Sequence, residues 1–457
     1  MTNHSRPGPG PRRDYRFPAV VRLGLANGLR VVVAPMPRLP LVTVLALVDA
    51  GATCDGPSNE GVASLTAQAL GEGTARLEAT ELTDQFEALG SGFDAGGDWD
   101  GTLASLTVTP SRLETAVMLL GEVLMTPRFS ERDVLRIRAE RLADLLQQQV
   151  EPRGLAEDRF AEYLYVPGSR YGVPCDGSAR TVGALETETV KAFHRARYVP
   201  QVTTLIFVGD VAPEPAVRLA ERALGAWMGE ALVAAPVDDR VRGGGPRVHI
   251  VGKPDAPQTE LRVGHRGLSR AHPDYFSIAV MNALLGGLFS SRINLNLRER
   301  HAFTYGAKSA FEWRRGAGPF VVATAVKTDV TAAAAREILA EIDTMRLETV
   351  TAGELSLATD YLDGVFPIRY ETTHAVAQAL AAAEVFALGE DYYSLYRERI
   401  RAVTAEDVHR VAEQHLHPRE IVIVAVGDAS AIQGPLEALG VGPVEVHGVK
   451  QGEEDVP

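Results

Sequence analysis

The chain contains an internal repeat, and this repeat constrains the fold more than any other feature of the sequence. The segment 185–211, LETETVKAFHRARYVPQVTTLIFVGDV, aligns without a gap on 403–429, VTAEDVHRVAEQHLHPREIVIVAVGDA. Both segments end in an apolar run followed by Gly-Asp, at Gly209-Asp210 and at Gly427-Asp428. A repeat of this kind indicates that one structural unit occurs twice in the chain.

A second pair of segments recurs in the same order. Ser130-x-x-Asp133 and Thr351-x-x-Glu354 each precede a run with helical periodicity, and both resemble the capping box that begins a helix. Two repeated blocks predict two similar domains of roughly 210 residues each. The expected divisions are a disordered arm at 1–14, an N-terminal α+β domain at 15–230, a linker at 231–247, a C-terminal α+β domain at 248–445 and an acidic tail at 446–457.

Strands and helices are mixed along the chain without a strict strand–helix–strand alternation. Asn27-Gly28 lies between VVRLGL and LRVVVAP, a pattern typical of a β-hairpin. Helical periodicity follows at about 58–90 and from Glu131 to about Gln149, with a strand expected at 104–109 between them. These patterns predict an α+β fold in which two homologous domains each contain a mostly antiparallel sheet packed against helices.

Charge and composition exclude several classes of protein. The chain has 46 basic and 59 acidic residues, a net charge of −13, which argues against binding to nucleic acid or to an anionic membrane surface. The only cysteines, Cys54 and Cys175, are interpreted as reduced thiols. The first residues lack the apolar core of a signal peptide, and we expect no membrane-spanning helix. A cytoplasmic protein is therefore expected, or a periplasmic one if an export signal has been removed from the sequence.

Several phrases around the repeat resemble the pitrilysin–insulinase family of zinc peptidases. They include Gly61-Val62-Ala63 before an early helix and GGLFSSRINLNLRERHAFTYGAKS at 286–309. The resemblance extends from the Asn27-Gly28 hairpin to Gly427-Asp428. It implies a clamshell fold, in which two homologous halves close around a peptide and are either fused in one chain or divided between two.

The residues that would bind zinc are missing from this chain. Where the family has H-x-x-E-H, the sequence reads Ser64-Leu65-Thr66-Ala67-Gln68. Zinc peptidase chemistry needs two imidazole ligands and a carboxylate that acts as the general base. Asp144, 76 residues after Gln68, occupies the place of the family's third ligand, and one carboxylate does not make a zinc site. We interpret Ser64, Ala67, Gln68 and Asp144 as a degenerate zinc motif and expect no metal or other cofactor in this chain.

The histidines show no alternative metal motif in their local spacing. The closest grouping is His409, Glu413 and His415, whose positions do not share one face of a helix. We interpret the histidines as structural residues.

Arg298 and Tyr305 match the family's Arg–Tyr pair. The resemblance implies that these side chains contact the substrate backbone and the oxygen that becomes negative when the peptide carbonyl is attacked. A guanidinium and a phenol are suitable donors to such an oxyanion. The alternative is that Arg298 is a surface charge on a helix and Tyr305 an ordinary strand residue. Gly286 and Gly287 match a possible substrate loop, although a turn before the helix start at 290–292 is equally consistent with them.

Together these features predict the zinc-less subunit of a heterodimeric metallopeptidase. The expected partner is a homologous subunit that carries H-x-x-E-H, holds zinc and hydrolyses the peptide substrate, while Arg298 and Tyr305 act in trans. Two alternatives remain open. One is a non-enzymatic scaffold like the family's respiratory-complex core subunits, and the other is a peptide-binding subunit that captures an extended strand at a sheet edge.

Overall fold

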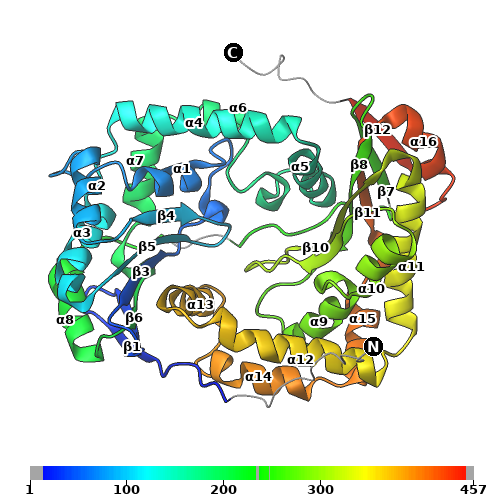
Figure 1. The fold of residues 1–457 in the computed structure, drawn as a ribbon. Coiled ribbons are helices and arrows are strands. Elements are labelled where there is room, and N and C mark those ends of the chain that lie inside the picture. Colours follow the sequence, from blue (N-terminus) through cyan, green and yellow to red (C-terminus); the bar gives the residue numbers. More distant parts are fainter. Residues whose placement is uncertain (1–13, 233–235, 246, 449–457) are drawn as a thin grey trace, which may run out of the picture.

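The computed structural model describes residues 14–232, 236–245 and 247–448. Almost all of the expected arm and residues 449–457 of the expected tail therefore lie outside the described residues. The described chain forms two six-stranded sheets covered by helices, with the first sheet on one side of the molecule and the second on the other (Figure 1). The two-domain α+β fold is confirmed.

Both sheets are mixed, with antiparallel pairs in the majority. The first has the order β1–β2–β6–β3–β5–β4, and only β2 and β6 are parallel neighbours. The second has the order β12–β7–β11–β8–β10–β9, in which β12, β7 and β11 run parallel. The strand bounds are β1 Val21–Gly24, β2 Arg30–Pro35, β3 Val42–Val48, β4 Asp94–Gly97, β5 Thr102–Val108, β6 Thr203–Gly209, β7 Arg247–Gly252, β8 Gln258–Arg266, β9 Ala307–Phe311, β10 Pro319–Lys327, β11 Val422–Gly427 and β12 Val444–Gly448.

The helices are distributed over both halves of the chain. Two π-helical segments, η5 (Ala283–Gly287) and η6 (Leu295–Arg300), flank the short α10. The α-helix bounds are α1 Val62–Ala69, α2 Ala79–Ala88, α3 Leu113–Met125, α4 Glu131–Val150, α5 Pro152–Leu164, α6 Ala179–Gly183, α7 Thr187–Arg197, α8 Pro213–Leu224, α9 Tyr275–Asn282, α10 Arg292–Asn294, α11 Thr331–Leu347, α12 Ala352–Arg369, α13 Thr373–Val385, α14 Tyr392–Ala402, α15 Ala405–His415 and α16 Ala429–Glu437.

The sequence repeat is a structural repeat. Helix α7 and strand β6 correspond to helix α15 and strand β11, and each strand takes the third place in its sheet. Thr351 caps α12 with a full capping box, and the Ser130 hydroxyl accepts a hydrogen bond from the backbone N–H of Asp133 at the start of α4. The hairpin around Asn27-Gly28 forms as predicted, with Gly28 at a φ of 90°.

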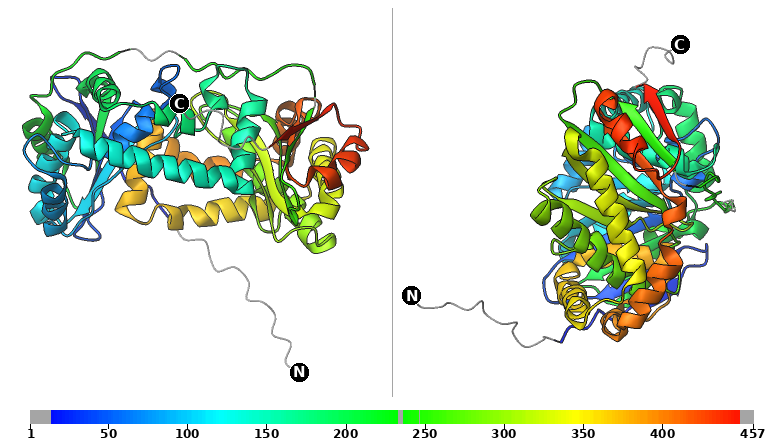
Figure 2. Two further views of the ribbon diagram at one scale, coloured as in Figure 1. Left: turned by 90° about the horizontal axis from the view of Figure 1, so that it is seen from above. Right: turned by 90° about the vertical axis from the view of Figure 1, so that its right-hand side faces the viewer.

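Each half of the chain contributes one helix to the sheet of the other half. Helix α13 packs on the first sheet, where Val376 and Leu380 join a cluster with Leu45 and Ile206. Helix α5 packs in the same way on β8 and β11 of the second sheet. Seen from above, α4 (cyan) runs from one half toward the other (Figure 2). The two domains are therefore interlocked, and neither sheet is covered on both faces by its own half of the chain.

Residues near two of the expected domain boundaries make contacts with the two domains. The Ser169 hydroxyl donates to the carbonyl oxygen of Asp238, and Tyr165 forms a β-bridge with Val241. This part of the expected linker therefore packs against the segment that follows α5. Strand β12 includes residues 446–448, which were expected to begin the acidic tail. Those three residues belong to the second sheet.

One segment has the length and hydropathy of a membrane helix, contrary to the expectation from sequence. It spans Tyr275–Arg300, and an 18-residue window within it has a mean hydropathy of 1.4. More than half of this window is buried inside the molecule, and Ile278, Met281 and Leu285 have no exposed surface. These contacts are those of a helix in the core of the second domain.

His194 connects the packing of the first domain to pH. This histidine lies on α7, is 8% exposed, and has Nε2 2.9 Å from the carbonyl oxygen of Leu124. Burial lowers the pKa of His194 to about 4. As the pH falls from about 6.5 to 4, His194 binds a proton in the unfolded chain but not in the folded chain. The folded state is therefore destabilised over this interval, and the loss of free energy of unfolding levels off below pH 4. The free energy of unfolding should fall by about 3 kcal/mol from this residue over that interval.

We expect His194→Gln to reduce this acid sensitivity, because glutamine can still donate to Leu124 and does not titrate. Urea unfolding of both chains between pH 4 and pH 7 measures the difference. The variant should lose about 3 kcal/mol less than the wild type over that interval. Parallel stability curves for the two chains would contradict the assignment.

Candidate functional site

Helix α1, which carries the degenerate zinc motif, begins at a buried carboxylate. Asp55 accepts hydrogen bonds from the backbone N–H groups of Gly61 at 2.8 Å and Ala63 at 3.0 Å. Gly61 has a φ of 99°, and a Cβ at this position would lie 2.6 Å from the carbonyl oxygen of Asp176. A glycine is therefore required where the chain turns into the helix.

Arg170 holds the neighbouring loop against this helix start. Its guanidinium lies 2.9 Å from Asp55 in a pair whose side chains are 9% and 0% exposed. The same guanidinium donates to the carbonyl oxygens of Val173, Pro174 and Cys175. Since Arg170 uses most of its donors in this way, it fixes the position of Asp176 immediately after them.

The degenerate motif is occupied by a hydrogen-bond network. The hydroxyl of Ser64, a residue that is 4% exposed, donates to Asp176 at 2.6 Å. Gln68 donates to Ser64 at 3.5 Å, and the guanidinium of Arg141 lies 3.4 Å from Asp176. This network contains no imidazole, and a guanidinium beside it raises the electrostatic cost of a divalent cation.

The other two positions of the motif add no ligand set. Ala67 is buried and offers no donor atom, and Asp144 lies exposed on α4. Within the described ranges, two groups of side chains are close enough to share a metal ion, and neither contains these residues. They are His249, Glu445 and His447, and His272, Asp274 and His415; local spacing in the sequence did not reveal them.

A cavity of about 470 Å³ lies in the second domain, against strands β8, β9 and β10. Gly286, Gly287 and Tyr305, three of the residues expected to act on substrate, line it. Tyr305 is 93% exposed, and its hydroxyl has no hydrogen-bond partner among the described residues. The structure thus presents this phenol to solvent at the cavity, rather than packing it in the core.

The two glycines end the segment η5 and lie close to other backbone. A Cβ on Gly286 would come within 2.5 Å of the backbone nitrogen of Ser309 on β9, and a Cβ on Gly287 would lie 3.0 Å from the carbonyl oxygen of Asn282. Gly286 therefore lets the turn pack directly on β9. This is a structural role, and it coexists with the position of both residues on the cavity wall.

Arg298 lies beside the cavity through its contact with an aromatic ring. Its guanidinium lies over the ring of Phe289, 4.4 Å from the centroid, and its Nε is 3.5 Å from Glu299. Phe289 lines the cavity and is 69% exposed. Sequence reasoning missed Phe289, because a lone aromatic residue in a loop carries no local signal.

The polar wall of the cavity was also missed. Arg262 on β8 is 2% exposed and donates to Glu260 at 2.8 Å and to the carbonyl oxygen of Arg153 at 3.1 Å. Arg153 belongs to α5, the helix that the first half contributes to the second sheet. The cavity therefore combines a buried charged wall with an aromatic rim formed by Phe289 and Tyr305. Such a surface can contact both the polar backbone and the side chains of a peptide.

Comparison with models of known protein families identifies the family of this chain. Residues 30–166 match the family described as Insulinase (Peptidase family M16), and residues 184–362 match the family described as Peptidase M16 inactive domain. The chain belongs to peptidase family M16. The first M16 match contains Ser64–Gln68, and the inactive-domain match contains both Arg298 and Tyr305.

Similar proteins of the M16 family cover most of the chain. An uncharacterized zinc protease of Mycobacterium leprae is 26% identical over 90% of this chain and 93% of its own length. The crystal structure of a peptidase M16 inactive domain from Pseudomonas fluorescens superposes with a TM-score of 0.83 and 26% identity, and covers 90% of this chain and 98% of that one. A chain of complex III2 from Candida albicans, at 15% identity, has the same fold with a TM-score of 0.76 and covers 92% of this chain and 99% of its own. An inactive M16 domain fits a non-catalytic member of the family.

Proposed function

We propose that this protein is the zinc-less subunit of a two-subunit M16 peptidase. A homologous partner with an intact H-x-x-E-H motif would hold zinc and hydrolyse the peptide. This chain would close the chamber, bind the extended substrate along the cavity, and stabilise the tetrahedral intermediate through Arg298 and Tyr305.

The exposure of Tyr305 carries this proposal. A phenol that is 93% exposed and has no partner among the described residues costs packing without stabilising the fold. Its position on the cavity, with Arg298 stacked on Phe289 nearby, gives two donors to one region. Closure of the chamber by the partner subunit would fix these donors, and donors fixed before the reaction stabilise a developing oxyanion most effectively.

The network at Ser64 supports the division of roles between two chains. Ser64 and Asp176 are paired with each other, and Arg141 places a cation beside them. Hydrolysis by the M16 mechanism would therefore need zinc from another subunit. A scaffold without catalysis is the competing function, and the reconstitution experiment separates the two.

The experiment begins with affinity capture of this chain from lysate of its source organism and identification of the co-purifying protein. We expect a near-stoichiometric homologue that carries H-x-x-E-H. The two purified chains are then mixed and assayed on a library of quenched fluorescent peptides. Cleavage by the mixture and by neither chain alone supports the proposal. A complex with no cleavage, or recovery with a large unrelated assembly, would favour the scaffold.

A further inference from the structure

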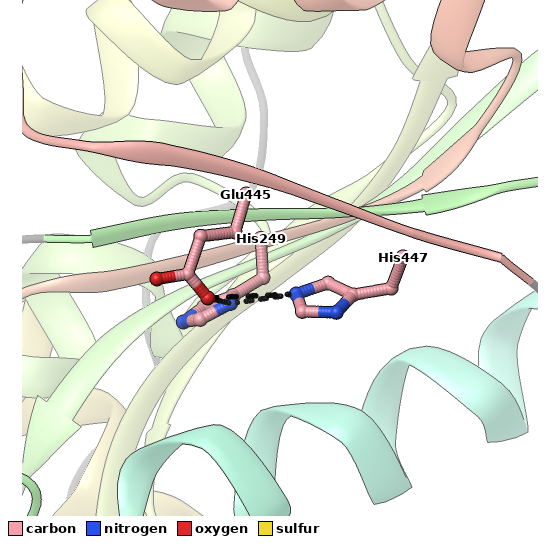
Figure 3. Close-up of side chains that lie close together, drawn as sticks. All are labelled: His249, Glu445 and His447. Atoms are coloured by element: carbon pink, nitrogen blue, oxygen red, sulfur yellow. Dashed lines mark hydrogen bonds and ion pairs between the residues drawn. The ribbon is translucent and has the colours of Figure 1, made fainter.

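Two strands at the edge of the second sheet bring together three side chains with the chemistry of metal ligands. His249 lies on β7, and Glu445 and His447 lie on β12 (Figure 3). Glu445 pairs directly with His249 in the parallel register of the strands. Because alternate residues of a strand share a face, His447 lies on the same side as Glu445. The figure shows the carboxylate of Glu445 and the ring of His447 both directed toward the ring of His249.

The distances within this cluster fit a single small cation. Nδ1 of His249 is 3.0 Å from Nε2 of His447 and 3.5 Å from Oε2 of Glu445, and the last two atoms are 3.9 Å apart. A triangle with these sides has a centre about 2.0 Å from each corner, inside the triangle. Zinc binds histidine nitrogen at about 2.0–2.1 Å and carboxylate oxygen at about 2.0–2.2 Å. The three atoms thus already surround a point at zinc-binding distance.

The cluster is held in place by a residue from the other half of the chain. The ring of Tyr163 on α5 stacks on His249 at 4.1 Å and on His447 at 4.8 Å. His249 is 4% exposed, and its Nε2 is buried without a hydrogen-bond partner. Stacking by Tyr163 and the contacts of Nδ1 are therefore what orient this ring.

We propose that His249, Glu445 and His447 form a divalent transition-metal site, with Zn²⁺ as the fitting ion. Two imidazoles and one carboxylate are a common zinc ligand set that leaves a further coordination position open. The side chains of Glu445 and His447 are 51% and 31% exposed, so solvent can reach that position. His447 also borders a second cavity, of about 670 Å³. The metal would join the edge strand β12 to β7. This site is separate from the degenerate M16 motif and does not depend on the proposed function.

The other histidine cluster is less suited to a cation and provides a matched control. In it, Asp274 already accepts two hydrogen bonds from Arg410, at 3.2 and 2.8 Å, and lies 2.7 Å from His415. A metal would have to displace a guanidinium from this carboxylate. Among the described residues no arginine or lysine pairs with Glu445, whose partners are the two histidines.

The test is a calorimetric titration of the chelator-treated full chain with Zn²⁺, repeated with Co²⁺ as a spectroscopic probe. We expect one equivalent of Zn²⁺ per chain, visible absorption bands of a low-coordinate Co²⁺ complex, and a higher melting temperature with metal. His447→Gln and Glu445→Gln should each weaken Zn²⁺ binding by at least the ~10–100-fold that even loss of an outer partner causes. His272→Gln should bind as the wild type does.

The outcomes are readily distinguished. Both glutamine substitutions lie on an exposed edge strand, and the melting temperatures of the metal-free chains show whether the variants are folded. An absence of Zn²⁺ binding by the wild type would overturn the proposal and leave His249 and His447 as a hydrogen-bonded pair. Binding that survives both substitutions, or that His272→Gln abolishes, would also overturn it. None of these measurements uses the peptidase partner. The metal-site proposal can therefore be disproved while the proposed function stands, and the proposed function can be disproved while the metal site stands.

Discussion

Replacing Arg298 by alanine is expected to lower the turnover of the reconstituted peptidase ~10²–10³-fold. The Arg298 side chain is 35% exposed, and in the described part of the chain its guanidinium stacks on Phe289 and lies beside Glu299. Its removal should therefore leave the fold intact while it eliminates a charged donor to the oxyanion. Tyr305→Phe, which removes one hydroxyl from an exposed ring, should act in the same direction. Steady-state kinetics on a cleaved peptide measure both effects.

The matched control for this prediction is Arg300→Ala. Arg300 lies two residues further on the same segment, is exposed, and carries the same charge. Turnover should be unaffected in this variant. Equal losses in Arg298→Ala and Arg300→Ala would mean that general charge, rather than a positioned donor, accounts for the effect. A loss confined to KM would place Arg298 in substrate binding alone.

Arg170→Ala should reduce the free energy of unfolding by about 3–5 kcal/mol, the usual cost of removing one partner from a buried ion pair. The variant would leave the Asp55 carboxylate, which has no exposed surface, without its counter-charge. It would also release the loop that presents Asp176 to Ser64. Urea unfolding monitored by circular dichroism measures the loss.

The control for this variant is an exposed pair of the same chemistry. Arg195 and Glu188 lie 2.7 Å apart, with side chains 64% and 67% exposed. Arg195→Ala should cost far less than Arg170→Ala, because water solvates and screens such a pair. Similar losses in the two variants would show that burial does not set the contribution of the Arg170–Asp55 pair.

The sequence predicted what is encoded locally. The repeated blocks gave helix α7 with strand β6 and helix α15 with strand β11, because apolar periodicity and the Pro-to-Gly-Asp spacing are properties of short segments. Arg298 and Tyr305 were selected because one phrase of the chain resembles the family, and their role in catalysis stays a prediction. Gly286 is an intermediate case: a turn and a substrate loop were both consistent with the sequence, and the close approach of this residue to Ser309 on β9 was not expected.

Contacts between distant segments could not be predicted. Ser64 and Asp176 are 112 residues apart, and His249 and His447 are 198 apart, so no spacing rule connects them. The exchange of α5 and α13 escaped prediction for a different reason. An apolar face on a predicted helix indicates that this face is buried, but it does not identify which of two similar sheets the helix packs on.

The exchange of helices has a consequence for synthesis of the protein on the ribosome. Strand β6 completes the first sheet at Gly209, whereas α13, the helix that covers the face of this sheet directed toward the second domain, begins only at Thr373. At about 5–20 residues per second, the nascent chain would carry that uncovered apolar face for roughly 10–30 s. During this time Leu45 and Ile206 would be available to chaperones or to other nascent chains. Slow translation between these two points should therefore favour aggregation more than slow translation anywhere after Val385.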